Sequence, residues 1–229
     1  MLRSLIRTVC AAVSLVLLPA PVAAAPAAAG PVVFGTVALA AGTTPYDQRW
    51  GIVQSQALGS GAGIATKARG LEGLERLRFV NRAVNAAISY RGDAGDSWAS
   101  ASESFKRGAG DCEDYAIAKM QVLRSVGVPA SDLFLVIGRD LAAGSDHAML
   151  IVRSGGSYWV LDNFINEVHA DSDYSEFRPV ITLSSQGRWL HGYKQGAALA
   201  VQAAASSQNS AQSSSGASLA AILTAQSGG

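Results

Sequence analysis

Cys112 stands in a setting that suits a thiol nucleophile. It follows two glycines, Gly108 and Gly110, and lies at the start of a segment, 111–126, whose apolar residues recur with helical spacing. Glycine permits a close approach of the chain to the start of a helix. There the helix dipole and the N–H groups of the first turn favour a thiolate, and the same N–H groups can receive a developing oxyanion. The local sequence therefore predicts a cysteine that attacks a carbonyl carbon.

His147 and Asp162 supply the two other side chains that such a reaction needs. His147 begins an expected strand and Asp162 ends the next one, with Gly155-Gly156 between them. A two-residue turn, which Gly-Gly favours, makes Asp162 the diagonal neighbour of His147 on the same face of the hairpin. A turn one residue earlier places them directly opposite, whereas a three-residue turn places them on opposite faces. We expect Asp162 to orient His147, which then accepts the proton of Cys112.

Each of these residues also has a plainer structural explanation. A single cysteine on an apolar helix face is more often a core residue, and an aspartate after a strand is more often a turn former. Their joint occurrence, together with a glycine-led helix start, favours catalysis. The other histidines, His169 and His191, are assigned structural roles because one catalytic histidine suffices.

The order of the expected elements indicates the fold class. Helices are expected over 71–89 and 111–126, and Gly127 and Pro129 end the second helix. Segments with the strand pattern follow at 133–137, 148–152, 158–161 and 180–183. Helices first and antiparallel strands afterwards predict an α+β domain.

The two ends of the chain differ in composition from its middle. Residues 1–25 combine arginines, a short apolar run and small residues, which is the pattern of a secretory signal peptide, with a retained N-terminal anchor as the alternative. An Ala/Pro/Gly-rich linker is expected over 26–42, and a disordered Ala/Ser/Gln-rich tail over 195–229. The working domain is therefore expected at 43–194.

The cysteine count and the net charge narrow the function further. The chain has 2 Cys, and Cys10 leaves with the expected signal peptide, so the mature chain keeps Cys112 alone. In an oxidising compartment a single cysteine is either an inert buried thiol or a reactive one. The formal net charge of +1 gives no electrostatic indication of a nucleic acid or an anionic membrane surface as partner. We expect a periplasmic or secreted protein that binds no nucleic acid.

The segment around Cys112 resembles a known signature. Gly110-Asp111-Cys112-Glu113-Asp114-Tyr115-Ala116-Ile117-Ala118-Lys119 is similar to the motif of the bacterial transglutaminase-like cysteine proteinases. This family includes LapG-like periplasmic cysteine proteases, which clip a large surface adhesin and so release a biofilm. The resemblance extends over about 43–194 and includes Phe79-Val80-Asn81, Val84-Asn85, Trp98-Ala99, Asp146-His147-Ala148, Val160-Leu161-Asp162-Asn163, Arg178-Pro179 and Trp189-Leu190-His191-Gly192.

This resemblance implies both a fold and a catalytic site. The fold is a papain/transglutaminase-like core in which the nucleophile helix packs on an antiparallel sheet. Cys112, His147 and Asp162 match the catalytic triad of the family. The family commonly has Trp-Ala-Thr-Pro where this chain has Trp98-Ala99-Ser100-Ala101, and this difference leaves the identity of the substrate open.

The resemblance further implies that Asp111 and Glu113 bind calcium. There is a physical reason to expect a bound cation here, because three carboxylates crowd the thiol, those of Asp111, Glu113 and Asp114. Left uncompensated they would raise the pKa of the thiol, and a bound calcium ion would neutralise their charge. The alternative is that these residues are only acids favoured at a helix N-terminus.

The leading functional hypothesis is an exported cysteine peptidase. It would hydrolyse a peptide bond in a cell-surface or periplasmic protein through a thioester intermediate. The resemblance implies a surface adhesin as the protein substrate and an inner-membrane regulatory protein as a further partner. Two alternatives stay open: a transglutaminase, amidase or cell-wall peptide hydrolase that uses the same triad, and a non-catalytic calcium-binding module.

Overall fold

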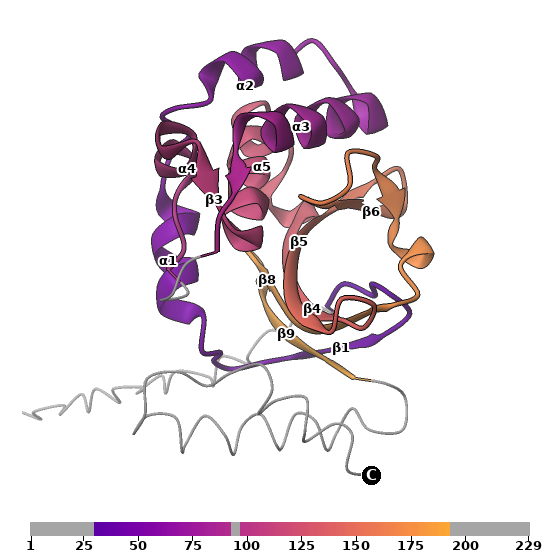
Figure 1. Cartoon of the computed structure of the whole chain (residues 1–229). Helices are drawn as coiled ribbons and strands as arrows, with labels where there is room; N and C mark the ends of the chain where they lie inside the picture. Colours follow the sequence, from indigo (N-terminus) through magenta and orange to yellow (C-terminus); the bar gives the residue numbers. More distant parts are fainter. Residues whose placement is uncertain (1–29, 93–96, 193–229) are drawn as a thin grey trace, which may run out of the picture.

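A seven-stranded antiparallel sheet is the centre of the fold. The computed structural model describes residues 30–92 and 97–192, and the strand order of its large sheet is β1-β9-β8-β4-β5-β6-β7. The sheet is strongly curved, and the helices lie together on its outer side (Figure 1). Its strands are β1 (Val37–Ala40), β4 (Leu133–Asp140), β5 (Ser145–Ser154), β6 (Ser157–Leu161), β7 (His169–Ala170), β8 (Phe177–Ser184) and β9 (Gly187–Gly192).

The helices precede most of the sheet in the chain. They are α1 (Asp47–Ser55), α2 (Ala62–Ala68), α3 (Gly73–Ala87), α4 (Ala101–Arg107) and α5 (Cys112–Ser125), with 3-10 turns at Ala130–Asp132 and Asp171–Asp173. The short strands β2 (Ser89–Tyr90) and β3 (Ala109–Gly110) pair in parallel just before α5. Within the described residues, no helix is long and apolar enough to cross a membrane. Helices followed by antiparallel strands confirm the expected α+β class.

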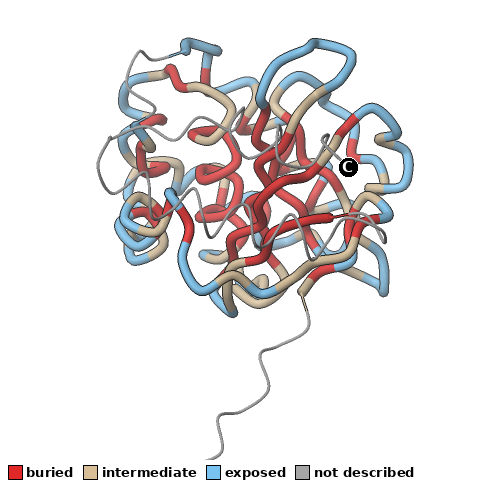
Figure 2. Tube along the Cα trace, turned by 90° about the horizontal axis from the view of Figure 1, so that it is seen from below, coloured by how far each residue is buried: buried red, intermediate tan, exposed pale blue. Residues whose placement is uncertain are grey.

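Alternate residues of β4 point into two different cores. Leu133, Leu135 and Ile137 belong to the cluster that the sheet shares with the helices, whereas Phe134 and Val136 belong to a smaller cluster on the other face. Successive side chains of a strand point to opposite faces, so a strand covered on both sides needs a continuous apolar run. Figure 2 shows the resulting concentration of buried residues in the middle of the domain.

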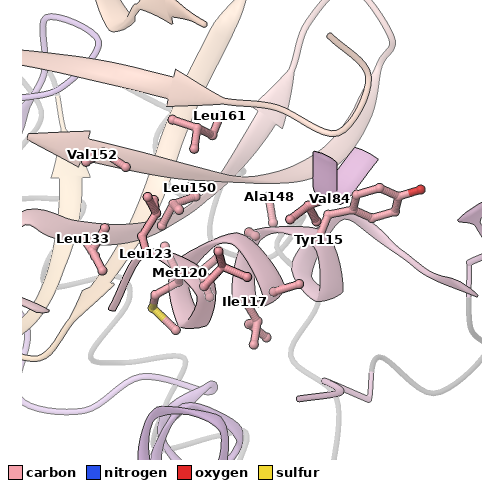
Figure 3. Packing of buried hydrophobic residues seen from close by; sticks show 14 of the residues in the cluster. Val84, Tyr115, Ile117, Met120, Leu123, Leu133, Ala148, Leu150, Val152 and Leu161 are labelled. Carbon is pink, nitrogen blue, oxygen red and sulfur yellow. The ribbon is translucent and has the colours of Figure 1, made fainter. Parts of the chain in front are cut away.

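Helix α5 lies between the sheet and the other helices. Every residue from Asp114 to Leu123 is buried. Figure 3 shows Leu123 of α5 packed beside Leu150 of β5 in the main cluster. Full burial of one leucine side chain contributes about 1.5–3 kcal/mol. This packing fixes the start of α5, and with it Cys112, relative to β5.

The residues expected to form a linker, 26–42, are in part a strand of the sheet. β1 pairs with β9 at the edge of the sheet, and Val33, just before β1, is fully buried. Thr36 Oγ1 is hydrogen-bonded to His191 Nδ1 at 2.7 Å. The prediction is therefore wrong for 30–42, which belongs to the domain. The low-complexity composition hid a stretch whose valines suit an edge strand.

The other expected elements agree with the structure, although their boundaries differ. The predicted helices correspond to α3 and α5, and the predicted strands lie within β4, β5, β6 and β8. The strand β9 and the short helices α1, α2 and α4 were not predicted. Short helices depend on tertiary packing more than on their own pattern. The expected signal peptide, 1–25, and the expected tail, 195–229, lie outside the described residues.

Atoms of the neighbouring strand β8 approach the backbone of β4 closely at Gly138. It pairs with His147 across β5, and the register of β4 with β8 shifts beside it. A Cβ at Gly138 would lie 2.3 Å from the carbonyl oxygen of Arg178 and 2.7 Å from Cζ of Phe177. Since a backbone atom cannot give way cheaply, the site excludes any larger residue.

We expect Gly138→Ala to lower the free energy of unfolding by about 1–3 kcal/mol, because overpacking of a well-filled site costs this much. Gly63→Ala is the matched control, because Gly63 lies within α2 and a Cβ there meets no atom within 4 Å. We expect the control to be stabilised by about 0.4–1 kcal/mol. Urea denaturation measures both changes, and equal stabilities of the two variants would contradict the close approach at Gly138.

Candidate active site

Close packing of Gly110 against Asp114 holds the segment before Cys112. Gly110 ends β3, and a Cβ on it would lie 2.6 Å from both Cβ and Oδ2 of Asp114. Asp111 is the N-cap residue of α5, and Cys112 is the first residue of the helix. The glycine is therefore required so that the chain can pass close to the helix that it enters. This arrangement places the thiol in the first turn of α5, as predicted.

Asp114 ties the segment that leads into the site to α5. Its Oδ1 accepts a hydrogen bond from the main-chain N–H of Ala99 at 2.7 Å, and its Oδ2 pairs with Arg107 Nη2 at 2.7 Å. Burial is the main cause that raises the pKa of Asp114, to about 6. The expectation that three carboxylates crowd the thiol is therefore corrected, because Asp114 turns away toward Arg107.

The thiol of Cys112 lies at an open edge of β5. The main-chain N–H of Ala148, the residue after His147, donates a hydrogen bond to Sγ. β6 pairs with β5 only from the Leu150–Leu161 pair onward, so it does not cover this part of the strand. The Cys112 thiol donates to Glu113 Oε2 at 3.0 Å. The nucleophile and the strand that carries the histidine are thus in direct contact.

The surroundings of the thiol oppose its ionisation. Burial is the largest cause that raises the pKa of Cys112, followed by the negative charge of Glu113 and the hydrogen bond to it. The N–H of Ala148 acts in the opposite direction, while Asp111 raises the pKa further. Burial and the charge of Asp111 also raise the pKa of Glu113, to about 8. The thiol proton points to Glu113 rather than to an imidazole.

The hairpin has the turn that the Gly155-Gly156 pair favoured. Ser154 pairs with Ser157, and both glycines have positive φ angles, 62° and 80°. This register puts the side chains of His147 and Asp162 on one face, as predicted. His147 Nε2 lies 3.0 Å from Asp162 Oδ1, and the two residues are 5% and 4% exposed.

Asp162 is held as a carboxylate in this buried position. Burial alone would raise its pKa, but the hydrogen bond and charge of His147, the N–H of Phe164 and the charge of Lys119 together lower it. The N–H of Phe164 donates to the same Oδ1 at 3.0 Å. With its Nε2 proton directed to Asp162, the imidazole keeps Nδ1 as the nitrogen that can accept a proton. The pair can thus orient and stabilise a general base.

Aromatic rings cover the imidazole on two sides. The ring of Phe164 stacks on His147 at 5.1 Å between centroids, and the ring of Phe177 meets it edge-on at 6.5 Å. A cavity of about 510 Å³ reaches His147 and Asp162, with Met149 and both rings in its wall. The imidazole is therefore restrained in orientation and bordered by a space that can take a substrate side chain.

Two asparagines of α3 hold the loop that follows Asp162. Asn85 Nδ2 donates to the carbonyl oxygen of Asp162 at 3.0 Å, and Asn81 Nδ2 donates to those of Ile165 at 2.8 Å and Asn166 at 3.1 Å. Their spacing of four residues places both on one face of the helix. The sequence indicates these asparagines only through the family resemblance, because nothing in the pattern of α3 shows which loop its polar face meets.

The other residues considered for the site have structural positions. His191 is buried between Thr36 and Thr182, which lie 2.7 and 2.6 Å from its ring nitrogens, and burial lowers its pKa to about 4. His169 is an exposed residue of β7. Trp98 stacks on Tyr46 at 5.4 Å and packs against the main core.

Asp111 and Glu113 are the acids that remain beside the thiol as candidates for a metal. Within 30–92 and 97–192, no group of three or more His, Cys, Asp or Glu side chains is arranged to hold a metal ion. The two carboxylates nevertheless suit a hard cation with oxygen ligands. The charge of Asp111 is one of the causes that raise the pKa of Glu113.

Comparisons with known proteins identify a family and a fold. The family model described as bacterial transglutaminase-like cysteine proteinase BTLCP matches residues 60–191, which is 132 of the 229 residues. A search of the curated proteins gives no match.

Among solved structures, Legionella pneumophila LapG has a similar fold, with 24% sequence identity and a TM-score of 0.52 over 65% of this chain and 88% of LapG. Its calcium-bound form gives 24% identity and a TM-score of 0.53 over the same shares of the two chains. The EGTA-treated form gives 23% identity and a TM-score of 0.52 over 67% of this chain and 92% of LapG. At these identities the likeness establishes the fold.

The family match covers the helix that carries Cys112, the strand that carries His147 and the end of the strand that leads to Asp162. These are the same elements that the geometry brings together around the thiol. The chain therefore belongs to the bacterial transglutaminase-like cysteine proteinases, and it is a cysteine peptidase.

Proposed function

We propose that this peptidase cleaves a peptide bond in an exported protein through a triad of Cys112, His147 and Asp162. The observation that carries the proposal is the buried 3.0 Å contact between His147 Nε2 and Asp162 Oδ1, one residue from the N–H that meets Cys112 Sγ. A base, its orienting carboxylate and a thiol are thus gathered at one edge of β5. Such an arrangement is the one that a cysteine nucleophile requires.

The reaction follows from the position of each group. The thiol proton passes to Nδ1 of His147, and the sulfur attacks the carbonyl carbon of the scissile peptide bond. N–H groups at the start of α5 stabilise the negative oxygen of the tetrahedral intermediate. The imidazolium then gives its proton to the leaving amine, and a thioester on Cys112 remains. Water, deprotonated by His147, hydrolyses the thioester and restores the thiol.

Calcium binding by Asp111 and Glu113 is the second part of the proposal. A bound calcium ion would supply positive charge that compensates the two carboxylates. Glu113 would then stop accepting the thiol proton, and the pKa of Cys112 would fall toward its usual value. Support comes from the crowded acids in this chain and from the calcium-bound and EGTA-treated forms in which LapG has been solved.

We further propose that the enzyme acts in the periplasm or outside the cell, on a surface protein such as an adhesin. The signal-peptide pattern of 1–25 and the single cysteine of the mature chain support export. The family resemblance supports an adhesin as substrate and an inner-membrane regulatory protein as partner. A comparison of the exported proteins of cells with wild-type enzyme and with Cys112→Ala identifies the substrate by its missing cleavage product.

The triad predicts how fast Cys112 reacts with iodoacetamide at neutral pH in the presence of excess calcium. We expect His147→Ala and Asp162→Asn each to lower this rate by about 10²-fold or more, since both remove the oriented base. Asp146→Asn is the matched control, because Asp146 is an exposed neighbour of His147 that pairs with Arg139. The control should keep the wild-type rate within about twofold. A wild-type rate equal to that of free cysteine, unchanged by His147→Ala, would exclude the proposed nucleophile.

Calcium should stabilise the protein and activate it. We expect excess calcium, compared with a chelator, to raise the melting temperature by several degrees, because a ligand that binds only the folded state stabilises it. The rate of substrate cleavage should rise in parallel. The double variant Asp111→Asn/Glu113→Gln should respond to neither condition. An identical melting temperature and identical rate of the wild type in chelator and calcium would refute the metal site.

Glu113→Gln should make the metal-free thiol more reactive. Above pH 8 the wild-type Glu113 carries its negative charge. Removal of this charge lowers the pKa of Cys112, so alkylation at pH 9 in the presence of chelator should become about tenfold faster. Glu75→Gln on the exposed side of α3 is the control and should not change the rate. If Glu113→Gln alkylates no faster than the wild type, Glu113 does not hold the thiol in its protonated form.

A further inference from the structure

Lys119 is a fully buried lysine on the helix that carries the nucleophile. It lies two turns after Cys112 in α5 and is 0% exposed. Lysines are among the residues least often found in a protein interior, because burial disfavours the ammonium ion. Burial lowers the pKa of Lys119 to about 7, against the opposing effect of Asp162. Because burying an ammonium ion costs free energy, we expect Lys119 to have a role other than filling the core.

The contacts of Lys119 lead to the carboxylate behind the imidazole. Its Nζ lies 3.4 Å from the carbonyl oxygen of Leu161, which is the last residue of β6 and directly precedes Asp162. The ammonium also lies 5.7 Å from the centre of the Tyr115 ring. The positive charge of Lys119 is one of the causes that lower the pKa of Asp162. One side chain thus joins the helix of the nucleophile to the end of the strand that presents the carboxylate.

A lysine that only filled space in the core would gain nothing over an apolar side chain of the same volume. A buried ion pair is often no more stabilising than apolar side chains of the same volume. Methionine would fill the same space in the main cluster without the cost of burying a charge. The position of the charge, beside a carboxylate that must stay ionised, therefore indicates a role in the site rather than in folding.

We propose that Lys119 is a positioning residue for the triad: it anchors the main chain before Asp162 and supplies the positive charge that keeps this carboxylate ionised. The inference rests on the proposed function of Cys112, His147 and Asp162. Lys119 lies two turns along α5 from Cys112 and contacts Leu161 and Tyr115, so it acts through Asp162.

The effect has a defined dependence on pH. The groups that face Lys119 are Asp162 after β6 and Tyr115 on its own helix, with His147 on β5 beyond Asp162. Below about pH 7 the lysine carries its charge, and this charge is lost as the pH rises through that value. Asp162 titrates well below pH 7, where Lys119 is fully charged. The positive charge of Lys119 is therefore present throughout the pH range in which Asp162 loses its proton.

The test uses two neutral replacements of Lys119 in the full-length protein. Lys119→Met keeps the volume, and Lys119→Gln keeps a donor for the Leu161 carbonyl but removes the charge. Gln121→Met is the matched control, because Gln121 is also buried on α5 and donates to a main-chain carbonyl, that of Val53 at 2.9 Å. Two quantities are measured: the ¹³C NMR titration of the Asp162 carboxylate and the rate of alkylation of Cys112 by iodoacetamide at pH 6.

We expect both Lys119 variants to move the titration of Asp162 to higher pH and to slow alkylation about tenfold or more. Gln121→Met should lower the melting temperature but change neither quantity. If Asp162 titrates as in the wild type and alkylation keeps its rate in whichever Lys119 variant folds, the inference is wrong. Failure of the proposed function gives a different result, because wild type and His147→Ala would then react alike, whatever Lys119 does to Asp162.

Discussion

The buried hydrogen bond between His147 and Asp162 is the interaction on which the site depends. It holds at 3.0 Å only because the β5–β6 hairpin has a two-residue turn, and a third turn residue would put the two side chains on opposite faces. Asp162 also needs groups that keep it charged away from water, and it receives the N–H of Phe164 and the charge of Lys119. Much of the polar chemistry in the core therefore serves one carboxylate.

The nucleophile is placed by apolar packing and controlled by charge. Helix α5 is fixed between the sheet and the other helices, and this brings Cys112 to the uncovered edge of β5. The acids of the same motif have separate tasks. Asp114 ties the preceding segment to the helix, whereas Glu113 accepts the thiol proton and, with Asp111, raises the pKa of the thiol. The negative charge of these two acids therefore opposes ionisation of the nucleophile.

The sequence predicted the parts of the fold that follow from local patterns. The long amphipathic and buried segments became α3, α5 and the central strands, and the parity of the hairpin correctly placed His147 beside Asp162. Features that depend on contacts between distant residues could not be predicted from the sequence. The pairing of β1 with β9, the turn of Asp114 toward Arg107 and the contact of Lys119 with Leu161 depend on residues distant in the chain, and composition made residues 30–42 look like a linker.

A double-mutant cycle on the alkylation rate of Cys112 tests most directly whether the three residues act as one unit. Asp162→Asn is measured in the wild-type background and again in the His147→Ala background. If Asp162 acts only through the imidazole, its replacement slows the reaction in the first background and has no further effect in the second. Effects that multiply in the double variant would mean that the aspartate and the histidine act independently, and this would contradict the triad.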